Sequence, residues 1–209
     1  MDPRPELLRY LELVNATVQA GLTFSKNVHD IERFHLLRRA TEQMLAKSLV
    51  DADRDLAAWL TADSGYPTPK IDVRALIVDE RHDVLLVREA SDGAWTLPGG
   101  WCDIGESPRE AVERECLEET GLTVRAVRLL ALWDKLKHPH PPQIPHAYKA
   151  FFLCRVEGGR LLTSTAETTG AAYYLVDALP ALSEHRVLGS QLRTLLEHVR
   201  LGRTETLFD

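Results

Sequence analysis

The first third of the chain carries apolar residues three or four positions apart, which is the spacing of one face of a helix. One such stripe covers residues 7–22 and a second covers residues 31–45. Asn27 and Asp30 precede the body of the second stripe, and their side-chain oxygens suit the cap of that helix. A third, shorter helix is expected to begin near Asp51. This region is therefore predicted to be helical, without strands.

The hydrophobic pattern changes after Gly65. Pro67 and Pro69 remove two backbone donors and favour extended structure, so they mark a boundary. Beyond them, short runs rich in β-branched and apolar residues alternate with turns. Strands are expected at residues 71–79, 84–87, 95–97, 122–133, 148–156 and 171–176, and helices at 107–120 and 187–200. Mixed strands with few helices indicate an α+β domain over residues 70–209, preceded by a helical domain over residues 1–65.

Composition and charge narrow the possible functions. Of the 209 residues, 44% are hydrophobic and 27% charged, which is ordinary for a globular chain and excludes wholesale disorder. The 25 Lys and Arg against 31 Asp and Glu give a net charge of −6 with neutral histidines. A nucleic-acid surface needs clustered Lys and Arg to neutralise phosphates, so this acidic chain is not expected to bind nucleic acid.

The cysteines and the apolar runs exclude further classes. Cys102, Cys116 and Cys154 form no Cys-x-x-Cys pair, so they are expected to be buried rather than zinc-binding or redox-active. No apolar run approaches the roughly 20 residues that cross a bilayer. Residues 1–5 lack the basic and then apolar layout of a secretory signal. We expect a cytoplasmic protein with no membrane partner.

The helix expected at residues 107–120 has well-specified ends. Ser107 suits the N-cap, Pro108 suits the first helical position, and Glu110 completes a capping box. Gly121 supplies a left-handed stop at the other end.

Three glutamates occupy one side of this helix. Glu115, Glu118 and Glu119 are three and four positions apart, which places them on roughly one 100° arc. Like charges so arranged destabilise a bare helix by a few tenths of a kcal/mol per pair, and a hard cation would reverse that cost. Carboxylates suit Mg²⁺ or Mn²⁺, and Mg²⁺ shares its shell with substrate phosphates, which indicates a di- or polyphosphate substrate. The alternative is a solvated acidic helix face.

The residues around these glutamates favour the metal site. They lie at fixed spacing and comprise Gly100, Glu106, Arg114, Glu115, Glu118, Glu119 and Gly121, followed by apolar Leu122. Seven identities at such spacing arise by chance on the order of once in ten million. The segment resembles the signature of the Nudix hydrolases. One position departs from it, because Cys116 stands where the family usually has an aliphatic residue.

This resemblance implies a fold, a metal and its ligands. The fold would be the Nudix fold, a mixed β-sheet sandwiched between helices, here with an N-terminal all-helical extension. By the same resemblance Glu115, Glu118 and Glu119 would bind Mg²⁺ or Mn²⁺, with the Gly100 carbonyl nearby. A metal-activated water would attack a phosphorus of a pyrophosphate.

The resemblance also implies supporting and proton-transfer roles. Arg114 is expected to pair with Glu106 and brace the loop. The catalytic base stays open between Glu118, Glu119 and Glu167. Glu167 lies outside the Nudix signature, and the alternative is that it is an exposed loop residue without a catalytic role.

Outside the Nudix signature, the sequence resembles one subgroup of the family. Residues 71–105 and the leading helices are similar to Nudix hydrolases that cleave nucleoside diphosphates linked to another moiety. Members resemble CDP-choline and ADP-ribose pyrophosphatases, carry an N-terminal helical extension and form homodimers. The subgroup tends to place a second acidic residue after the position of Glu167, where this chain has Thr168, Thr169 and Gly170. That departure leaves a further metal ligand there in doubt.

Several residues are candidates for substrate binding, each with a structural alternative. Arg74 and Arg88 are expected on adjacent strands, where guanidinium groups suit bidentate phosphate contacts or surface ion pairs. Trp101 suits stacking on a base, with core packing as the alternative. Arg186 is expected to form an ion pair near a helix start.

The loop at residues 135–146 is rich in histidine and proline. His138 within it and Lys149 beyond it are candidates for contact with the distal part of the substrate. Zinc binding is disfavoured because the prolines prevent ligand spacing of the ordinary kind. The remaining alternatives are a substrate-facing loop and an exposed linker.

The sequence thus favours an enzyme that splits a nucleoside diphosphate derivative, such as a CDP-alcohol or nucleotide sugar, into a nucleoside monophosphate and a phosphorylated second moiety. A runner-up acts on nucleoside triphosphates or RNA 5′ ends. A third hypothesis is a non-catalytic regulator that senses nucleotides and binds DNA or a partner through its helices. Residues 1–69 hold 8 basic and 10 acidic side chains, a net charge of −2, which disfavours DNA binding.

Overall fold

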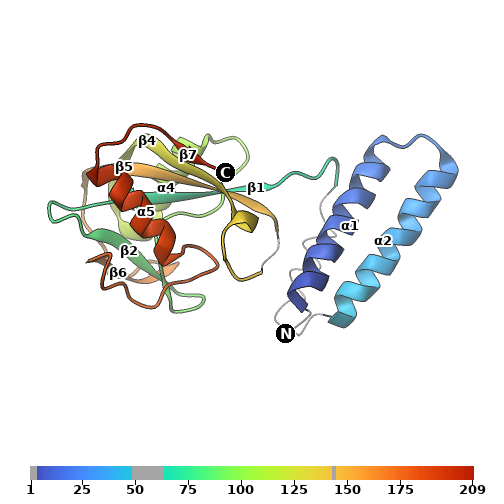
Figure 1. Ribbon diagram of the computed structural model, residues 1–209, viewed down its shortest axis with the longest axis horizontal. Coiled ribbons are helices and arrows are strands. Elements are labelled where there is room, and N and C mark those ends of the chain that lie inside the picture. The colour runs from blue at the N-terminus through green and yellow to red at the C-terminus, as the bar shows by residue number, and fades with distance from the viewer. Residues whose placement is uncertain (1–3, 49–63, 143–144) are drawn as a thin grey trace. The chain divides into compact units, whose positions relative to one another are not determined.

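The computed structural model of the protein describes residues 4–48, 64–142 and 145–209. The chain divides into two compact units (Figure 1). The first contains residues 1–69 and 142–146, and the second contains residues 70–141 and 147–209. The segment Pro142–His146 therefore groups with the helical unit, although the sequence places it in a loop of the second domain. The helix expected near Asp51 lies outside the described residues.

The first unit contains two helices side by side, α1 (Arg4–Phe24) and α2 (Val28–Ser48), as both apolar stripes predicted (Figure 1). The turn between them is capped by Asn27, whose Oδ1 accepts a hydrogen bond from the His29 amide at 2.9 Å. The first backbone amides of a helix have no carbonyl acceptor within the helix, and this bond satisfies one of them at the start of α2.

The two helices pack through the predicted stripes. Leu11, Val18 and Leu45 are buried. Gly21 allows a close approach, because a Cβ there would overlap the ring of Phe34. Within the described residues, no helix is long and apolar enough to span a bilayer.

The second unit is built on two β-sheets. The first has the order β1-β5-β4-β7, with β1 (Lys70–Ile77), β5 (Ala147–Gly159), β4 (Leu122–Asp134) and β7 (Leu207–Phe208). It is mixed, since β5 pairs in parallel with β1 and antiparallel with β4. The second sheet is antiparallel, with β3 (Trp95–Thr96), β2 (Val84–Glu89) and β6 (Thr168–Tyr174) in the order β3-β2-β6.

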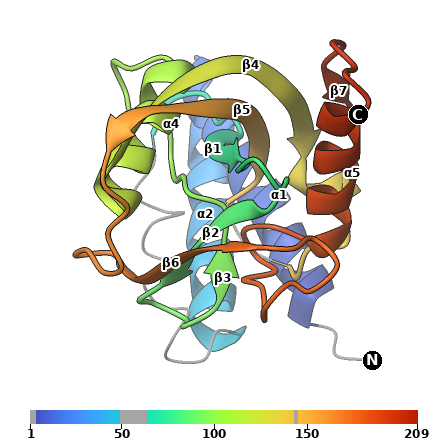
Figure 2. The ribbon, with the colours of Figure 1, turned by 90° about the vertical axis from the view of Figure 1, so that its left-hand side faces the viewer.

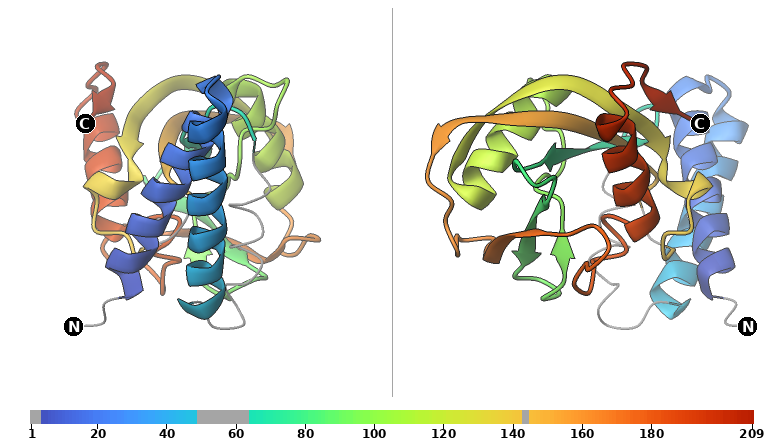
Figure 3. Two further views of the ribbon diagram at one scale, coloured as in Figure 1. Left: turned by 90° about the vertical axis from the view of Figure 1, so that its right-hand side faces the viewer. Right: turned by 60° about the vertical axis from the view of Figure 1, so that its left-hand side comes forward.

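Two helices cover opposite faces of the mixed sheet, α4 (Pro108–Thr120) and α5 (Gly189–Arg200) (Figures 2 and 3). Alternation along β1 explains this arrangement, because successive side chains of a strand point to opposite faces. Val73 and Ala75 pack with α4, whereas Leu76 packs with α5. The Nudix-type fold, a mixed sheet between helices preceded by a helical extension, is therefore confirmed.

Two short elements were not predicted. A 3₁₀ turn, η2 (Lys135–Lys137), begins where the Asp134 carboxylate accepts from the Leu136 amide at 2.8 Å. The two-residue strand β7 exists only through its pairing with β4. Neither carries enough sequence periodicity to be recognised along the chain.

Gly121 ends α4 as predicted, with a φ of 71° and its amide donating to the Leu117 carbonyl at 2.9 Å. A Cβ there would lie 2.7 Å from Leu162 and 2.8 Å from the Arg160 carbonyl oxygen. Gly121→Ala should lower the free energy of unfolding by at least about 1–2 kcal/mol, because the left-handed backbone and the contacts both oppose a side chain. Urea unfolding measures this. Gly158→Ala, at an open position, is the control, and equal losses in both variants would contradict the assignment.

Candidate active site

The loop between β3 and α4 lies directly against β1, and glycine permits the close approach. A Cβ at Gly99 would overlap the carbonyl of Val73, and Gly99 has a φ of 137°. The Val73 amide donates to the Gly100 carbonyl oxygen at 2.8 Å, and the Ala75 amide donates to the Pro98 carbonyl oxygen at 2.8 Å. These two hydrogen bonds fix the position of the loop before α4 against β1, and glycine permits the close approach.

The start of α4 has the predicted capping box. The Ser107 hydroxyl accepts from the Glu110 amide at 3.3 Å, and the Glu110 carboxylate accepts from the Ser107 amide at 2.8 Å. With both ends of the helix defined, Glu115 and Glu119 project one turn apart from the same side.

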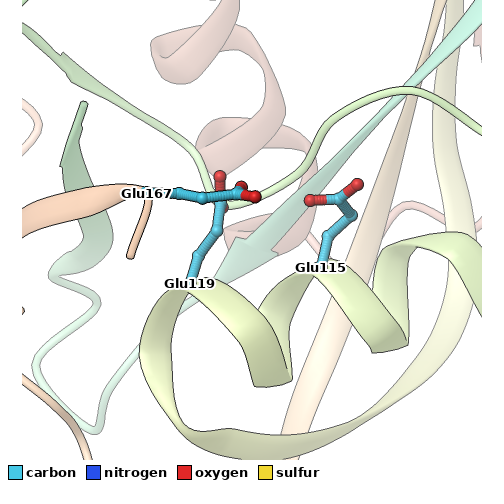
Figure 4. Close-up of side chains that lie close together, drawn as sticks. All are labelled: Glu115, Glu119 and Glu167. Atoms are coloured by element: carbon cyan, nitrogen blue, oxygen red, sulfur yellow. The ribbon is translucent and has the colours of Figure 1, made fainter. Parts of the chain in front are cut away.

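Three carboxylates meet at this side of α4. Oxygen atoms of Glu115, Glu119 and Glu167 all lie within 4.8 Å of one another (Figure 4). Glu115 and Glu119 are 8% and 4% exposed, while Glu167 is exposed. The absence of a side chain at Gly100 leaves room for Glu115, since a Cβ there would lie 2.7 Å from Glu115 Oε1. The structure thus brings two glutamates of the Nudix signature, Glu115 and Glu119, next to Glu167, the loop glutamate that the sequence analysis proposed.

Glu167 is positioned by its backbone neighbours. The Thr168 hydroxyl donates to the Glu119 carbonyl oxygen at 2.9 Å, and the Ala90 amide donates to the Glu167 carbonyl oxygen at 3.0 Å. The β2–β6 pairing shifts its register at Glu89, beside these bonds. Irregular pairing of this kind re-aims a side chain, and here it accompanies the turn of Glu167 toward α4.

The cluster is electrostatically unfavourable without a cation. Burial raises the pKa of Glu119 to about 8, against the opposing effects of Arg74 and the Gly99 amide, which donates to Glu119 Oε2 at 2.8 Å. Burial also raises the pKa of Glu115. Close carboxylates in a dry site need either a proton or a metal ion. An all-oxygen donor set fits a hard divalent cation such as Mg²⁺ or Mn²⁺.

Arg114 forms ion pairs with the other charged residues of the Nudix signature. It binds Glu106 in bidentate fashion, at 2.7 Å and 3.0 Å, which confirms the predicted brace and lowers the pKa of Glu106 to about 2. The same guanidinium lies 3.0 Å from Glu115 and 2.9 Å from Glu118. Glu118 therefore faces Arg114 and is not part of the three-carboxylate cluster, so its roles as ligand and base stay predictions.

Arg74 and Lys149 are buried beside the loop, not displayed on a surface. Arg74 is 4% exposed and Lys149 is 1% exposed. Arg74 donates to Asp72 at 2.7 Å and to the Leu97 carbonyl oxygen at 3.1 Å, and Lys149 pairs with the other oxygen of Asp72. Arg74 thus forms an ion pair, as the alternative in the sequence analysis had it, but the pair is buried and does not lie on the surface. Substrate contact by either residue stays a prediction.

Arg88 and Trp101 are exposed. Arg88 donates through Nε to the Gly93 carbonyl oxygen at 2.8 Å. Trp101 is 47% exposed, so its ring is not packed in the core. Their predicted substrate contacts remain untested by these positions.

The histidines after β4 are engaged with protein groups. His138 lies 3.3 Å from Asp209 and its ring centroid is 4.9 Å from that of Trp133. His140 Nδ1 lies 2.6 Å from the Glu184 carbonyl oxygen. In the part of the chain that the structure describes, no histidine belongs to a group close enough to hold a metal. Contact between His138 and substrate stays a prediction.

Sequence reasoning missed a fourth carboxylate near the cluster. Glu89 is 9% exposed, pairs with Arg186 at 3.1 Å and contributes to the raised pKa of Glu119. Arg186 also binds Asp92 at 2.8 Å, so the predicted ion pair of Arg186 is confirmed, with partners distant in sequence. The available signal was the position of Glu89 in the strand β2, directly after the apolar run Val84–Val87 and Arg88.

Comparison with known proteins agrees with this geometry. A family model described as the NUDIX domain matches residues 68–195. A second, described as a UDP-X-like, N-terminal oligomerisation domain, matches residues 5–59.

Individual relatives extend the similarity over the whole chain. A Bacillus subtilis protein named "Putative ADP-ribose pyrophosphatase YjhB" is 43% identical over 97% of this chain and 96% of its own. A solved structure described as a UDP-X diphosphatase is 33% identical to this chain and has a TM-score of 0.63. The match covers 99% of this chain and 99% of the other. An ADP-ribose pyrophosphatase structure from Streptococcus suis is 42% identical over 68% of this chain and 100% of its own, with a TM-score of 0.60. The chain belongs to the Nudix hydrolase family, whose members act on pyrophosphate bonds.

Proposed function

We propose that this protein hydrolyses the pyrophosphate bond of a nucleoside diphosphate linked to a second moiety, in a reaction that depends on a divalent metal. The products are a nucleoside monophosphate and the phosphorylated second moiety. The observation that carries the proposal is the convergence of Glu115, Glu119 and Glu167 beside the loop at Gly100.

The relatives support this substrate class. The names ADP-ribose pyrophosphatase and UDP-X diphosphatase both describe a nucleoside diphosphate esterified to another group. The match of the helical region to a UDP-X-like domain points the same way. CDP-choline belongs to the same chemical class and is retained as a candidate substrate.

We assign the metal, Mg²⁺ or alternatively Mn²⁺, to Glu115, Glu119 and Glu167. When bound, it would neutralise phosphate charge and activate a water. The Gly100 carbonyl already accepts one hydrogen bond from Val73 and has a second lone pair available for the ion. Glu118 joins the ligand set only if its carboxylate exchanges Arg114 for the metal.

The catalytic base is proposed among Glu118, Glu119 and Glu167. A base removed by substitution lowers kcat while metal affinity persists, whereas a lost ligand weakens both. Measuring metal affinity by calorimetry alongside kcat for each Gln variant therefore separates the two roles.

Glu115→Gln and Glu119→Gln should each reduce hydrolysis of ADP-ribose, UDP-sugars or CDP-choline by about 100-fold or more, because each removes a charge from the metal site. Released monophosphate, followed by chromatography with Mg²⁺ present, measures the rate. Glu157→Gln, at an exposed position of β5, is the matched control and should retain full activity. Wild-type rates in the Glu119 variant would show that the metal site is misassigned. Absence of turnover by folded wild-type protein on every diphosphate derivative would favour the nucleotide-sensing alternative.

Without metal, the raised pKa of Glu119 makes stability depend on pH. The folded state holds the proton up to a pH of about 8, and the unfolded state loses it near 4.5. This contribution is therefore present below pH 4.5 and is lost as the pH rises through about 8, by at most about 1.4 kcal/mol per pH unit. We expect the Tm of chelated wild-type protein to fall between pH 5 and 8 more steeply than that of Glu119→Gln. Parallel curves would contradict the buried, protonated state of Glu119.

We further propose that the protein forms a homodimer through the helical unit. Large apolar side chains are exposed along α1 and α2, namely Tyr10, Leu13, Phe24, Val28, Leu36, Leu37 and Met44. Apolar surface of this extent on a soluble helical pair is typical of an interface. The match to an N-terminal oligomerisation domain supports the same assignment.

Light scattering should give the mass of two chains at micromolar concentration. Leu13→Glu and Leu36→Glu should shift it toward one chain, because each places a charge in the apolar surface. Leu201→Glu, at an exposed position of the second unit, is the control. A monomeric wild-type protein would overturn the proposal.

A further inference from the structure

Glu167 is the member of the carboxylate cluster that does not lie on α4. It stands directly before β6 and extends toward Glu119 (Figure 4). The residue is exposed, and an exposed loop side chain has considerable rotamer freedom to lose when it is ordered. Its place in the cluster therefore depends on how firmly its backbone is held.

Two sets of hydrogen bonds hold the backbone at Glu167. The Thr165 hydroxyl accepts from the Glu167 amide at 3.2 Å and from the Thr168 amide at 3.1 Å. The Ala90 amide donates to the Glu167 carbonyl oxygen at 3.0 Å. The first set lies within the loop itself, so the bond from Ala90 is the one that ties Glu167 to the end of β2.

One guanidinium holds the short segment that carries this amide. Arg186 Nε lies 3.1 Å from Glu89 Oε1. Its Nη1 donates to Asp92 Oδ2 at 2.8 Å, and its Nη2 donates to Ser91 Oγ at 3.1 Å. These three acceptors lie immediately before and after Ala90 in the chain. Arginine suits this task because its planar fork presents several donors in a fixed geometry.

Arg186 is in turn anchored by its own loop and by β3. Ser183 Oγ accepts from Arg186 Nη1 at 2.8 Å and donates to Asp92 Oδ2 at 2.7 Å. Ser183 is 3% exposed, and its amide donates to the Trp95 carbonyl oxygen at 2.8 Å. The Arg186 amide donates to the Ser183 carbonyl oxygen at 2.8 Å. The guanidinium therefore has a defined position from which it restrains the segment around Ala90.

The contact between Arg186 and Glu89 also offsets repulsion at the cluster. Burial raises the pKa of Glu89, the charges of Arg186 and Arg74 oppose this, and nearby carboxylates, Glu167 among them, add to it. The charge of Glu89 likewise contributes to the raised pKa of Glu119. Arg186 thus pairs with a carboxylate that would otherwise repel the cluster more strongly.

We propose that Arg186 is a positioning residue for the metal site, which holds Glu167 in the carboxylate cluster through residues 89–92 and the amide of Ala90. It acts through this segment and is assigned no contact with substrate or metal. A ligand held in place before the ion arrives binds it at a lower cost of reorganisation. This role deepens the proposed function and rests on it, because it takes Glu167 as a metal ligand.

The test measures the Mn²⁺ affinity of full-length protein by calorimetry, without substrate. Arg186→Met should raise the Kd by about 10-fold or more, the usual effect of losing a residue that orients a ligand. Arg186→Lys should bind Mn²⁺ more tightly than Arg186→Met, because the ammonium keeps the charge and part of the contacts. Arg193→Met, at an exposed arginine on α5, is the matched control and should bind like the wild type.

A double-mutant cycle separates positioning from general damage to the fold. In a Glu167→Gln background, Arg186→Met should change the Kd little, because the ligand that Arg186 positions is already lost. General damage would weaken binding by the same factor in both backgrounds. Asp92→Asn removes a charged anchor of the guanidinium and preserves the side-chain shape. It should give a smaller loss with the same dependence on Glu167, and it provides the test if Arg186→Met does not fold.

Hydrogen exchange follows the contact itself in metal-free protein. In chelator, the Ala90 amide should exchange faster in Arg186→Met than in the wild type, because the segment that carries it is no longer restrained. The Val73 amide, which donates to the Gly100 carbonyl oxygen, is the internal control and should keep its rate.

Several results would overturn the positioning role. These are wild-type Mn²⁺ affinity in Arg186→Met, equal losses in both Glu167 backgrounds, and unchanged exchange at Ala90. A gain in affinity on loss of Arg186 would also overturn it, since Arg186 would then withhold Glu89 from the metal.

The Gln variants of the cluster distinguish this failure from failure of the proposed function. Weak Mn²⁺ binding by Glu115→Gln, Glu119→Gln and Glu167→Gln, with wild-type binding by Arg186→Met, would remove the positioning role and leave the metal site standing. Wild-type affinity in Glu167→Gln alone would remove both the ligand role of Glu167 and the positioning role. Wild-type affinity in all three Gln variants would overturn the proposed metal site itself.

Discussion

Mutual repulsion among Glu115, Glu119 and Glu167 is the constraint on which the second unit depends. Their oxygens lie within 4.8 Å of one another, and two of the three side chains are buried. Such an arrangement is stable only when surrounding groups hold each carboxylate in place and a proton or cation offsets the charge. The Gly99 amide and the closely approached Gly100 supply part of that support.

Guanidinium groups surround the cluster, and each is anchored by a carboxylate outside it. The pairs are Arg74 with Asp72, Arg114 with Glu106, and Arg186 with Glu89. Because each arginine is already bound, its position is defined before any ligand arrives, which lowers the cost of reorganisation during catalysis.

Local sequence was sufficient wherever the interactions are local. The capping box of Ser107 and Glu110 and the left-handed stop at Gly121 involve neighbours along the chain, so α4 was predicted almost to the residue. Apolar periodicity likewise predicted α1, α2 and most strands. The elements β7 and η2 escaped prediction because distant pairing or a single side-chain bond, rather than periodicity, creates them.

The sequence by itself determined the family, the bounds of the helix to which we assign the metal site, and the brace between Arg114 and Glu106, because spacing along one helix and its adjoining loop decides them. Only the tertiary structure decided which carboxylates meet. Helical periodicity places Glu118 on the same arc as Glu119, yet Arg114 draws Glu118 away, and the irregular β2–β6 pairing brings Glu167 in instead. Contacts between residues far apart in the chain depend on strand register and side-chain competition, and neither of these is encoded in local spacing.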